Sequence, residues 1–176
     1  MKTTSDRRRF LQTAGVTAGT FTILNASSAR AFAANEKLNI ASIGAGGQAA
    51  SDIRSVASEN IVALCDVDQN RAAGSFNKFP KAKRFKDYRV MLHEMESQID
   101  AVIVGTPDHH HFHASMAAIE LGKHVYCEKP LTHSVWEARE LTLAARKAGV
   151  ATQMGNQAQA SEQTRVVQEF VMDNAI

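Results

Sequence analysis

A glycine-rich turn, Gly44-Ala45-Gly46-Gly47-Gln48-Ala49, follows the apolar run 38–43 and precedes a helical pattern. Gly44 would allow a tight turn after a strand, and Gly46 has no Cβ, so a phosphate could approach its backbone closely. Ala49 is small enough for the helix to pack against the strand. The free N–H groups and the dipole at the helix start would attract an anion. This spacing is typical of a dinucleotide-binding turn.

An acidic residue stands at the end of the next apolar run. Residues 60–65 lead into Asp66, which lies 22 positions after Gly44. A carboxylate at that distance suits a contact with the ribose 2′-hydroxyl of NAD, and it would repel the 2′-phosphate of NADP. The sequence therefore predicts an NAD site, with NADP as the open alternative. A plain α/β domain with a tight turn and a solvated aspartate is the competing interpretation.

A third candidate stretch follows the strongly apolar run 100–105. Thr106 and Pro107 come first and could line the nicotinamide side of a cleft. Four histidines follow within five positions, namely His109, His110, His111 and His113. Consecutive side chains at a helix start point in different directions, and no cysteine or acidic cluster is obviously paired with them, so we expect no metal site. Solvated or packed roles are expected for His109, His110 and His113.

Two further polar stretches follow predicted strands. Lys129 comes after the run 124–127 and before Pro130, which would hold it rigidly at the cleft. Partial desolvation there would suit its amine for moving a proton or polarising a hydroxyl, whereas a surface lysine before a turn is the alternative. Asn156 follows the last predicted strand. Its amide could contact a carboxamide or sugar hydroxyl, or it could cap the next helix.

The elements that must position these residues alternate along the chain. Apolar β-rich runs predict strands, and segments of helical period separate them. The strands are expected at 38–43, 61–65, 83–86, 100–105, 124–127 and 150–154, and the helices at 47–57, 71–79, 87–95, 111–121, 132–147 and 161–174. This rhythm predicts the α/β class, specifically a Rossmann-type doubly wound parallel sheet with helices on both faces.

Length and charge narrow the class of protein. The chain has 176 residues, enough for one domain, and its composition is that of an ordinary globular protein. Its formal charge of +2 comes from the N-terminal segment, because beyond residue 33 there are 15 basic and 17 acidic residues. Nothing in this balance suggests nucleic-acid binding. Cys65 and Cys127 are expected to be small buried residues, with a disulfide as the alternative.

The first 33 residues resemble a twin-arginine export signal. Residues 6–12 contain three consecutive arginines before Phe10 and Leu11, a mildly apolar stretch covers 13–24, and Ala31-Phe32-Ala33 resembles a cleavage site. The apolar stretch is too short and too rich in Thr, Gly and Ala to span a membrane. We therefore expect export, to the periplasm or beyond, without a membrane anchor. A disordered basic tail is the alternative.

Taken together, these residues resemble the glucose–fructose oxidoreductase, inositol dehydrogenase and MocA family. The matching stretches are the turn at 44–49, Cys65-Asp66, Thr106-Pro107 followed by His111, residues 122–125, and above all Glu128-Lys129-Pro130. The resemblance implies an NAD(P)-binding domain, here residues 34–157, followed by a larger α/β domain that holds a sugar. Residues 158–176 would lead into that domain, so the sequence is expected to be truncated and to lack the family's usual catalytic histidine.

The resemblance also implies roles for single residues. Lys129 would contact the substrate hydroxyl as the catalytic residue, Glu128 would sit beside the nicotinamide ribose, and the Lys129–Pro130 bond would be cis. The cofactor site is expected to take in a wider set: Gly44, Ala45, Gly46, Gly47, Gln48, Asp66, Thr106, Pro107, His111, Glu128, Lys129 and Asn156.

The implied activity is hydride transfer between the nicotinamide and a hydroxyl of a sugar, cyclitol or glycoside. The full-length protein would be a homo-oligomer. Two alternatives stay open. One is a redox-assisted glycoside hydrolase or lyase. The other, if the chain truly ends at Ile176, is a nucleotide-binding domain without catalysis.

Overall fold

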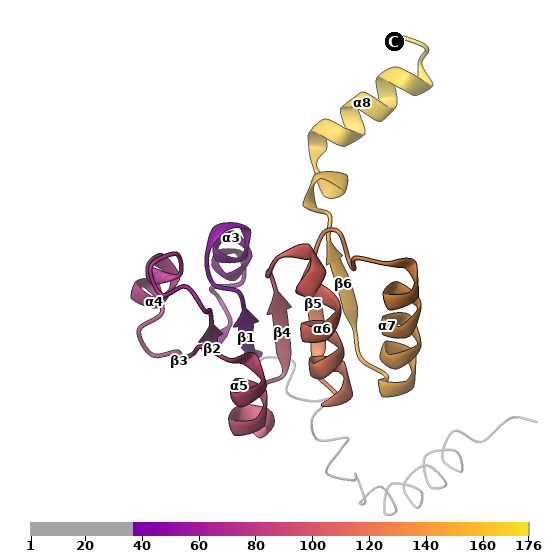
Figure 1. The fold of residues 1–176 in the computed structure, drawn as a ribbon. Coiled ribbons are helices and arrows are strands. Elements are labelled where there is room, and N and C mark those ends of the chain that lie inside the picture. The colour runs from indigo at the N-terminus through magenta and orange to yellow at the C-terminus, as the bar shows by residue number, and fades with distance from the viewer. Residues whose placement is uncertain (1–36, 176) are drawn as a thin grey trace, which may run out of the picture. The chain divides into compact units, whose positions relative to one another are not determined.

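The computed structural model describes residues 37–175, so the export signal predicted for residues 1–33 lies outside the described residues. Six parallel strands form one sheet in the order β3-β2-β1-β4-β5-β6 (Figure 1). The strands are β1 Asn39–Ile43, β2 Asn60–Cys65, β3 Lys83–Phe85, β4 Ala101–Val104, β5 His124–Glu128 and β6 Thr152–Gly155. The doubly wound α/β fold predicted from the alternating pattern is confirmed.

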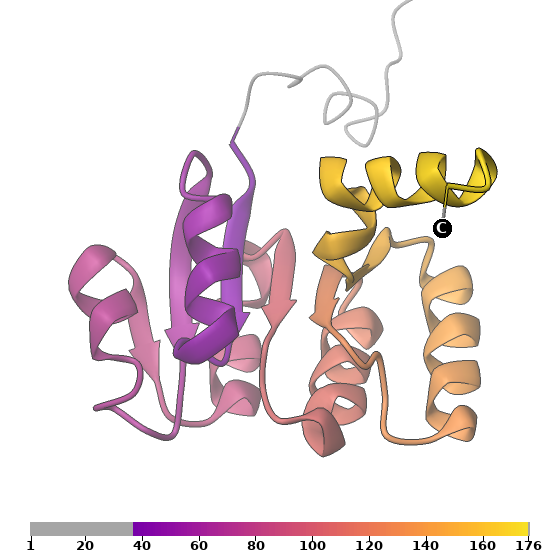
Figure 2. The same cartoon turned by 90° about the horizontal axis from the view of Figure 1, so that it is seen from above.

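Helices connect successive strands and cover the two faces of the sheet. They are α3 Gly47–Ser55, α4 Ala73–Lys78, α5 Tyr88–Met95, α6 His111–Glu120 and α7 Val135–Ala148, with short 3-10 turns η2 Glu96–Gln98 and η3 Asp108–His110. The turn η4 Gln157–Ala160 and the helix α8 Glu162–Met172 follow the last strand. One apolar cluster joins the sheet to α3 and α4, and a larger one joins it to α5, α6 and α7. In both ribbon views α8 stands apart from α7, and none of its residues is buried (Figures 1 and 2).

Local chemistry explains where several helices begin and end. The Asp87 side chain accepts a hydrogen bond from the N–H of Arg89 and so caps α5. Ser134 and Glu137 form a capping box at the start of α7, and Gly149 ends that helix in the left-handed conformation. The helix predicted at 71–79 is shorter than expected. Asp68 Oδ1 accepts from the N–H groups of residues 70 and 71, which makes a turn of the segment before Ala73.

Both cysteines are buried and free, as the sequence predicts. Burial raises the pKa of Cys65 to about 12 and that of Cys127 to about 11, so each behaves as a small apolar residue. Over residues 37–175, no helix combines the length and apolar character needed to cross a bilayer.

Candidate functional site

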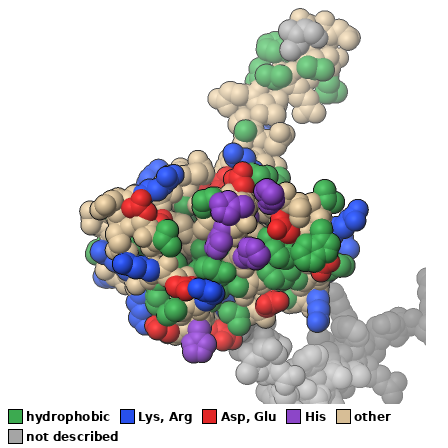
Figure 3. Space-filling view, in the orientation of Figure 1, with side chains coloured by type: hydrophobic (Ala, Val, Ile, Leu, Met, Phe, Trp, Pro, Cys, Tyr) green, Lys and Arg blue, Asp and Glu red, His purple; other side chains and the backbone are tan. Residues whose placement is uncertain are grey.

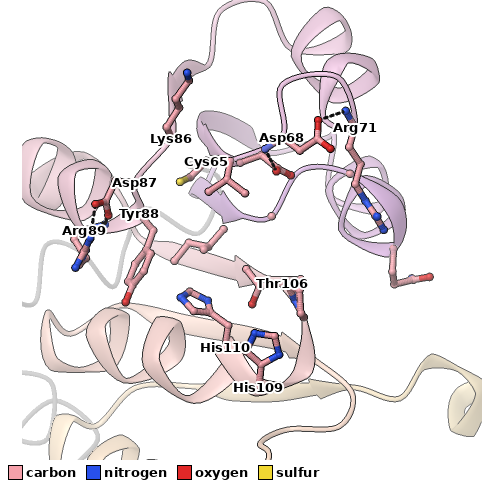
Figure 4. Close-up of a pocket in the computed structure, with 18 residues that line it drawn as sticks. Cys65, Asp68, Arg71, Lys86, Asp87, Tyr88, Arg89, Thr106, His109 and His110 are labelled. Carbon is pink, nitrogen blue, oxygen red and sulfur yellow. Dashed lines mark hydrogen bonds and ion pairs between the residues drawn. The ribbon is translucent and has the colours of Figure 1, made fainter.

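A cleft of about 750 Å³ opens at the carboxyl ends of β1, β2 and β4 (Figure 4). Ligands of doubly wound sheets bind at this edge, beside the strand where the chain changes direction across the sheet. The close-up shows Thr106, His109 and His110 on one side of the cleft and Asp68 and Arg71 on the other. Of the predicted cofactor residues, the lining includes Gly44, Gly46, Gln48, Asp66, Thr106 and Pro107.

The glycines of the turn are required by close backbone approaches. Gly44 has a φ of +90°, and a Cβ there would lie 2.6 Å from the carbonyl oxygen of Gly105. A Cβ on Gly46 would lie 2.6 Å from Cγ of Arg71. Ala49 is fully buried, and a Cβ on Gly105 would lie 2.5 Å from the Cβ of Ala49. Helix α3 therefore packs closely against the end of β4. The glycines therefore allow this close packing, and the turn still reaches the surface at the start of α3, where Gly46 is half-buried and Gly47 is exposed.

Asp66 ties the glycine turn to the end of β2. Its Oδ2 accepts the N–H of Ala45 at 2.8 Å, and its Oδ1 accepts the N–H of Asp68 at 2.9 Å. These bonds fix the carboxylate at the rim of the cleft, at the strand end where a ribose is recognised in such folds. Ala45 itself is buried and contributes this backbone donor.

Arg71 is a cleft residue that sequence reasoning missed. Its guanidinium lies over the turn, because Nη2 would be 3.0 Å from a Cβ on Gly47. A cation at the start of α3 adds to the positive end of the helix dipole, which favours a phosphate there. The sequence signal that could have identified Arg71 is the presence of a basic residue in the short loop after Asp66. Gly47 itself has a φ of +56°.

The wall of the cleft that is formed by residues 87–89 and His110 carries an ion pair and two half-buried rings. Arg89 donates to Asp87 at 2.6 Å and holds the pKa of that carboxyl at about 2. Tyr88 packs edge-on against His110, with ring centroids 5.2 Å apart. Burial, followed by the neighbouring histidines, lowers the pKa of His110. This favours the neutral ring at neutral pH.

The histidines gather on one face of the molecule beside hydrophobic side chains (Figure 3). His109 and His113 are exposed, and His113 lies against the rings of His110 and Phe112. Within the described part of the chain, no three His, Cys, Asp or Glu side chains are grouped so that they could hold a metal ion. His109 and His113 are thus solvent-exposed and His110 is packed among rings, and the expected lack of a metal site stays a prediction.

The buried side chain of His111 contacts two loops of the site, one at Thr106 and one at Pro130. It is 1 % exposed, with Nε2 2.8 Å from the carbonyl oxygen of Thr106 and Nδ1 2.7 Å from that of Pro130. Since both partners are acceptors, a neutral ring can satisfy only one of them. His111 does not line the cleft, and its predicted contact with the cofactor stays a prediction. What it does in this structure is fix the backbone behind Thr106.

A polar cluster around two buried carboxyl groups lies at the carboxyl ends of β5 and β6. Glu128 is 5 % exposed, and its Oε1 accepts from Gln157 Nε2 at 2.6 Å. The same amide lies 2.8 Å from the hydroxyl of Tyr126 and 3.3 Å from Oδ1 of Asp52, on α3. Gly155 makes room for the carboxylate, because any Cβ there would collide with it. Asp52, Tyr126 and Gln157 were missed from the sequence, since only the fold brings them together.

Lys129 and Asn156 lie at the same edge of the sheet. The Lys129–Pro130 bond is cis, as the resemblance implies, and the N–H of Lys129 donates to Oε2 of Glu128 at 3.2 Å. The Lys129 side chain is exposed, so the described chain does not supply the partial desolvation expected for it. Asn156 is also exposed and makes no side-chain capping bond to η4, which removes the capping alternative.

The cleft fits a dinucleotide on its own geometry. Two glycines leave the backbone of the turn open to a phosphate, and a cation lies beside it. Oγ1 of Thr106 is buried without a hydrogen-bond partner, so a ligand group could satisfy it. The residues present therefore suit a pyrophosphate between two nucleosides, with Asp66 at one end and the Thr106 loop toward the other.

Comparison with known proteins decides the family. The sequence profile described as "Oxidoreductase family, NAD-binding Rossmann fold" of the GFO/IDH/MocA proteins matches residues 38–156. This chain belongs to the GFO/IDH/MocA family. The NAD-binding fold of this family is the six-stranded sheet described above, and the cofactor class is NAD.

Three members or neighbours of the family show how far the similarity reaches. The 1,5-anhydro-D-fructose reductase of Ensifer adhaerens is 49 % identical over 55 residues, 31 % of this chain and 16 % of that protein. The D-glucoside 3-dehydrogenase of Escherichia coli is 35 % identical over 89 residues, 51 % of this chain and 25 % of that protein. The crystal structure of myo-inositol 2-dehydrogenase from Lactobacillus plantarum superposes with a TM-score of 0.70 at 23 % identity, covering 80 % of this chain and 42 % of that one. The chain therefore spans less than half the length of these proteins.

Proposed function

We propose that the whole protein is an NAD-dependent oxidoreductase that transfers a hydride between the nicotinamide and a hydroxyl-bearing carbon of a sugar, cyclitol or glycoside. The observation that carries the proposal is the shared edge of the sheet. There the glycine turn, Asp66 and Thr106 border one cleft, and Glu128 and Lys129 follow at the end of β5. Dehydrogenases of a glucoside and of inositol among the relatives support the substrate class.

The chain's own residues have distinct parts in this proposal. Asp66 would accept from the adenosine ribose, and Arg71 with the start of α3 would neutralise the pyrophosphate. Lys129 would hold the proton of the substrate hydroxyl while the C–H bond is broken. When bound, the nicotinamide accepts or returns the hydride. Since Lys129 is exposed here, the sugar and further protein around it would have to exclude water from its amine.

Replacement of Lys129 tests the proposal. In the complete gene product, Lys129→Ala should lower turnover on responsive polyols by about 10²- to 10⁴-fold, the usual contribution of a positioned proton-transfer group. Nucleotide affinity should change little, because the glycine turn and Asp66 lie on other strands. Lys147→Ala, an exposed lysine near the end of α7, is the matched control. Normal turnover of Lys129→Ala, or loss of nucleotide binding, would show that Lys129 is not the proton-transfer group.

Export is a second, separate part of the proposal. It is supported by the arginines at 7–9, the apolar stretch 13–24 and Ala31-Phe32-Ala33. Arg7→Lys with Arg8→Lys should leave the protein in the cytoplasm as an uncleaved precursor, as judged by fractionation and intact mass. Export of that variant at the normal level would contradict a twin-arginine route.

A further inference from the structure

Two buried carboxyl groups lie next to the turn that carries Lys129 and share one hydrogen-bond donor. Asp52, on α3, is 8 % exposed, and Glu128, at the end of β5, is 5 % exposed. A single amide joins them, because Gln157 Nε2 reaches Oε1 of Glu128 at 2.6 Å and Oδ1 of Asp52 at 3.3 Å. The nucleotide-binding helix and the Lys129 turn therefore share one polar cluster.

Over residues 37–175, the hydrogen bonds to these two acids come from side-chain amides and a backbone N–H group. Helix α3 contributes Gln48, whose Nε2 donates to Oδ1 of Asp52 at 3.0 Å, and β5 contributes the Tyr126 hydroxyl. Among the described residues no Lys or Arg side chain hydrogen-bonds to either carboxyl group. Lys129 offers only its backbone N–H, and its side chain is exposed. Asp52 and His124 both line a second groove, separate from the cleft. Nδ1 of His124 accepts the N–H of residue 151.

One atom of the pair has no partner. Oδ2 of Asp52 is buried and accepts no hydrogen bond. Burial raises the pKa of Asp52, and the negative charge of Glu128 raises it further. A proton on Oδ2 would turn this orphaned acceptor into a donor beside the Glu128 carboxylate, and it would remove the repulsion between two buried charges.

We propose that Asp52 holds a proton on Oδ2, shared by hydrogen bonding with the Glu128 carboxylate, in the nucleotide-free protein and releases this shared proton when the oxidised, cationic nicotinamide binds. The proton passes to solvent, and no electron moves in this step. The inference rests on the proposed function, because it places the nicotinamide near Glu128. Asp66 defines the adenosine end of the cleft, so the nicotinamide end lies toward β4, β5 and β6.

The charge of the ring explains the direction of the effect. The oxidised ring carries one positive charge and favours the doubly ionised pair, whereas the reduced ring is neutral and leaves the proton in place. The preference for NAD⁺ over NADH should therefore increase with pH. If the ring shifts the pKa of Asp52 by about one unit, the ratio of the two affinities changes about tenfold across the transition.

The first experiment needs no nucleotide. Carbon-13 NMR of this chain, labelled at Asp and Glu carboxyl carbons, should show one carboxyl, that of Asp52, that titrates above the usual range of an aspartate. That signal should be lost in Asp52→Asn and displaced in Glu128→Gln, since each variant removes one acid at nearly unchanged volume. If all the carboxyl groups of the free protein titrate in the ordinary acidic range, the shared proton does not exist and the inference is wrong.

The second experiment measures the released proton. Calorimetric titration with NAD⁺ and with NADH, each in buffers of different ionisation enthalpy, gives the protons released per nucleotide bound. We expect release with NAD⁺, little with NADH, and none with either nucleotide in Asp52→Asn or Glu128→Gln. Glu120→Gln, an exposed carboxylate on α6, should behave as the unmodified protein does.

The outcomes separate the two proposals. Binding of both nucleotides with equal proton release would overturn this inference and leave the proposed function standing. Failure to bind either nucleotide would remove the proposed function and the release step with it, even if NMR finds the shared proton. If Asp52→Asn does not fold, as judged by circular dichroism, Glu128→Gln decides the result, because it removes the partner acid from another element.

Discussion

Glu128 and Gly155 are register partners on β5 and β6, and the Glu128 carboxylate fills the space that a side chain on residue 155 would need. The glycine at the end of β6 is thus a condition for the buried acid at the end of β5. Gln157 then closes over the carboxylate from the following turn. A substitution at residue 155 can therefore disturb the site without replacing a charged residue.

Gly155→Ala should destabilise the domain. The added methyl group would force the Glu128 side chain or the end of β6 to move, and overpacking of this kind costs about 1–3 kcal/mol. Chemical denaturation followed by circular dichroism measures the change. Gly74→Ala is the control, because a Cβ at residue 74 of α4 meets nothing within 4 Å. It should leave the stability unchanged or raise it by about 0.5 kcal/mol. Equal stability of the two variants would contradict the assigned packing.

Gly44→Ala should lose nucleotide binding as well as stability. Its Cβ would be 2.6 Å from the carbonyl oxygen of Gly105, and its φ is positive. Gly122→Ala has a comparable φ of +70° but open space around the new methyl group, so it isolates the conformational cost of about 1 kcal/mol. Fluorescence titration with NADH should show at least about tenfold weaker binding for Gly44→Ala only. Equal affinities in the two variants would mean that the close approach at Gly44 is unimportant.

Asp66→Asn should shift the cofactor preference toward NADP. The substitution removes the charge that repels a 2′-phosphate, while the remaining amide oxygen can still accept the N–H of Ala45. Arg71 lies across the same turn and would attract the phosphate. We expect the ratio of NAD to NADP affinity to fall by about tenfold, as measured by competition against NADH. An unchanged ratio would place the ribose away from Asp66.

The buried thiols predict the behaviour of the protein in alkali. The pKa of Cys65 is about 12 when folded, whereas the unfolded thiol ionises near 9. Between these values the unfolded state loses its proton first, so the stability that the neutral thiol contributes is complete below pH 9 and declines above it. Native protein at pH 8 should react with a thiol reagent far more slowly than denatured protein, which should expose both cysteines. Fast labelling of the native protein would show that the thiols are accessible.

The sequence predicted most of the fold because its signals are local. A glycine turn after an apolar run, Ser134 three positions before Glu137, and Gly149 after a helical period each act within a few residues. The cleft could be predicted for the same reason, since parallel strands bring their carboxyl ends to one edge. Asp52 and Gln157 are 105 positions apart, so their contact depends on how the fold brings the turn after β6 beside α3 and has no local signal.

The exposure of Lys129 could not be predicted either. Its position after β5 is local, but its burial depends on what lies above the edge of the sheet. His111 is a similar case. The family resemblance implies a contact with the cofactor, which stays a prediction, and no local signal showed that the fold turns both ring nitrogens toward backbone carbonyls of two loops.

The position of β1 in the middle of the sheet affects how the nascent chain folds during synthesis. β1 pairs with β2 on one side and with β4 on the other, and β4 begins only at Ala101. As the chain leaves the ribosome, β1 and β2 can pair early, while the other edge of β1 stays open until β4 has emerged. An unpaired apolar edge is a template for joining another chain. Newly made molecules are therefore most prone to aggregate while residues 44–100 emerge, and a chaperone that shields strand edges should raise the yield most in that interval.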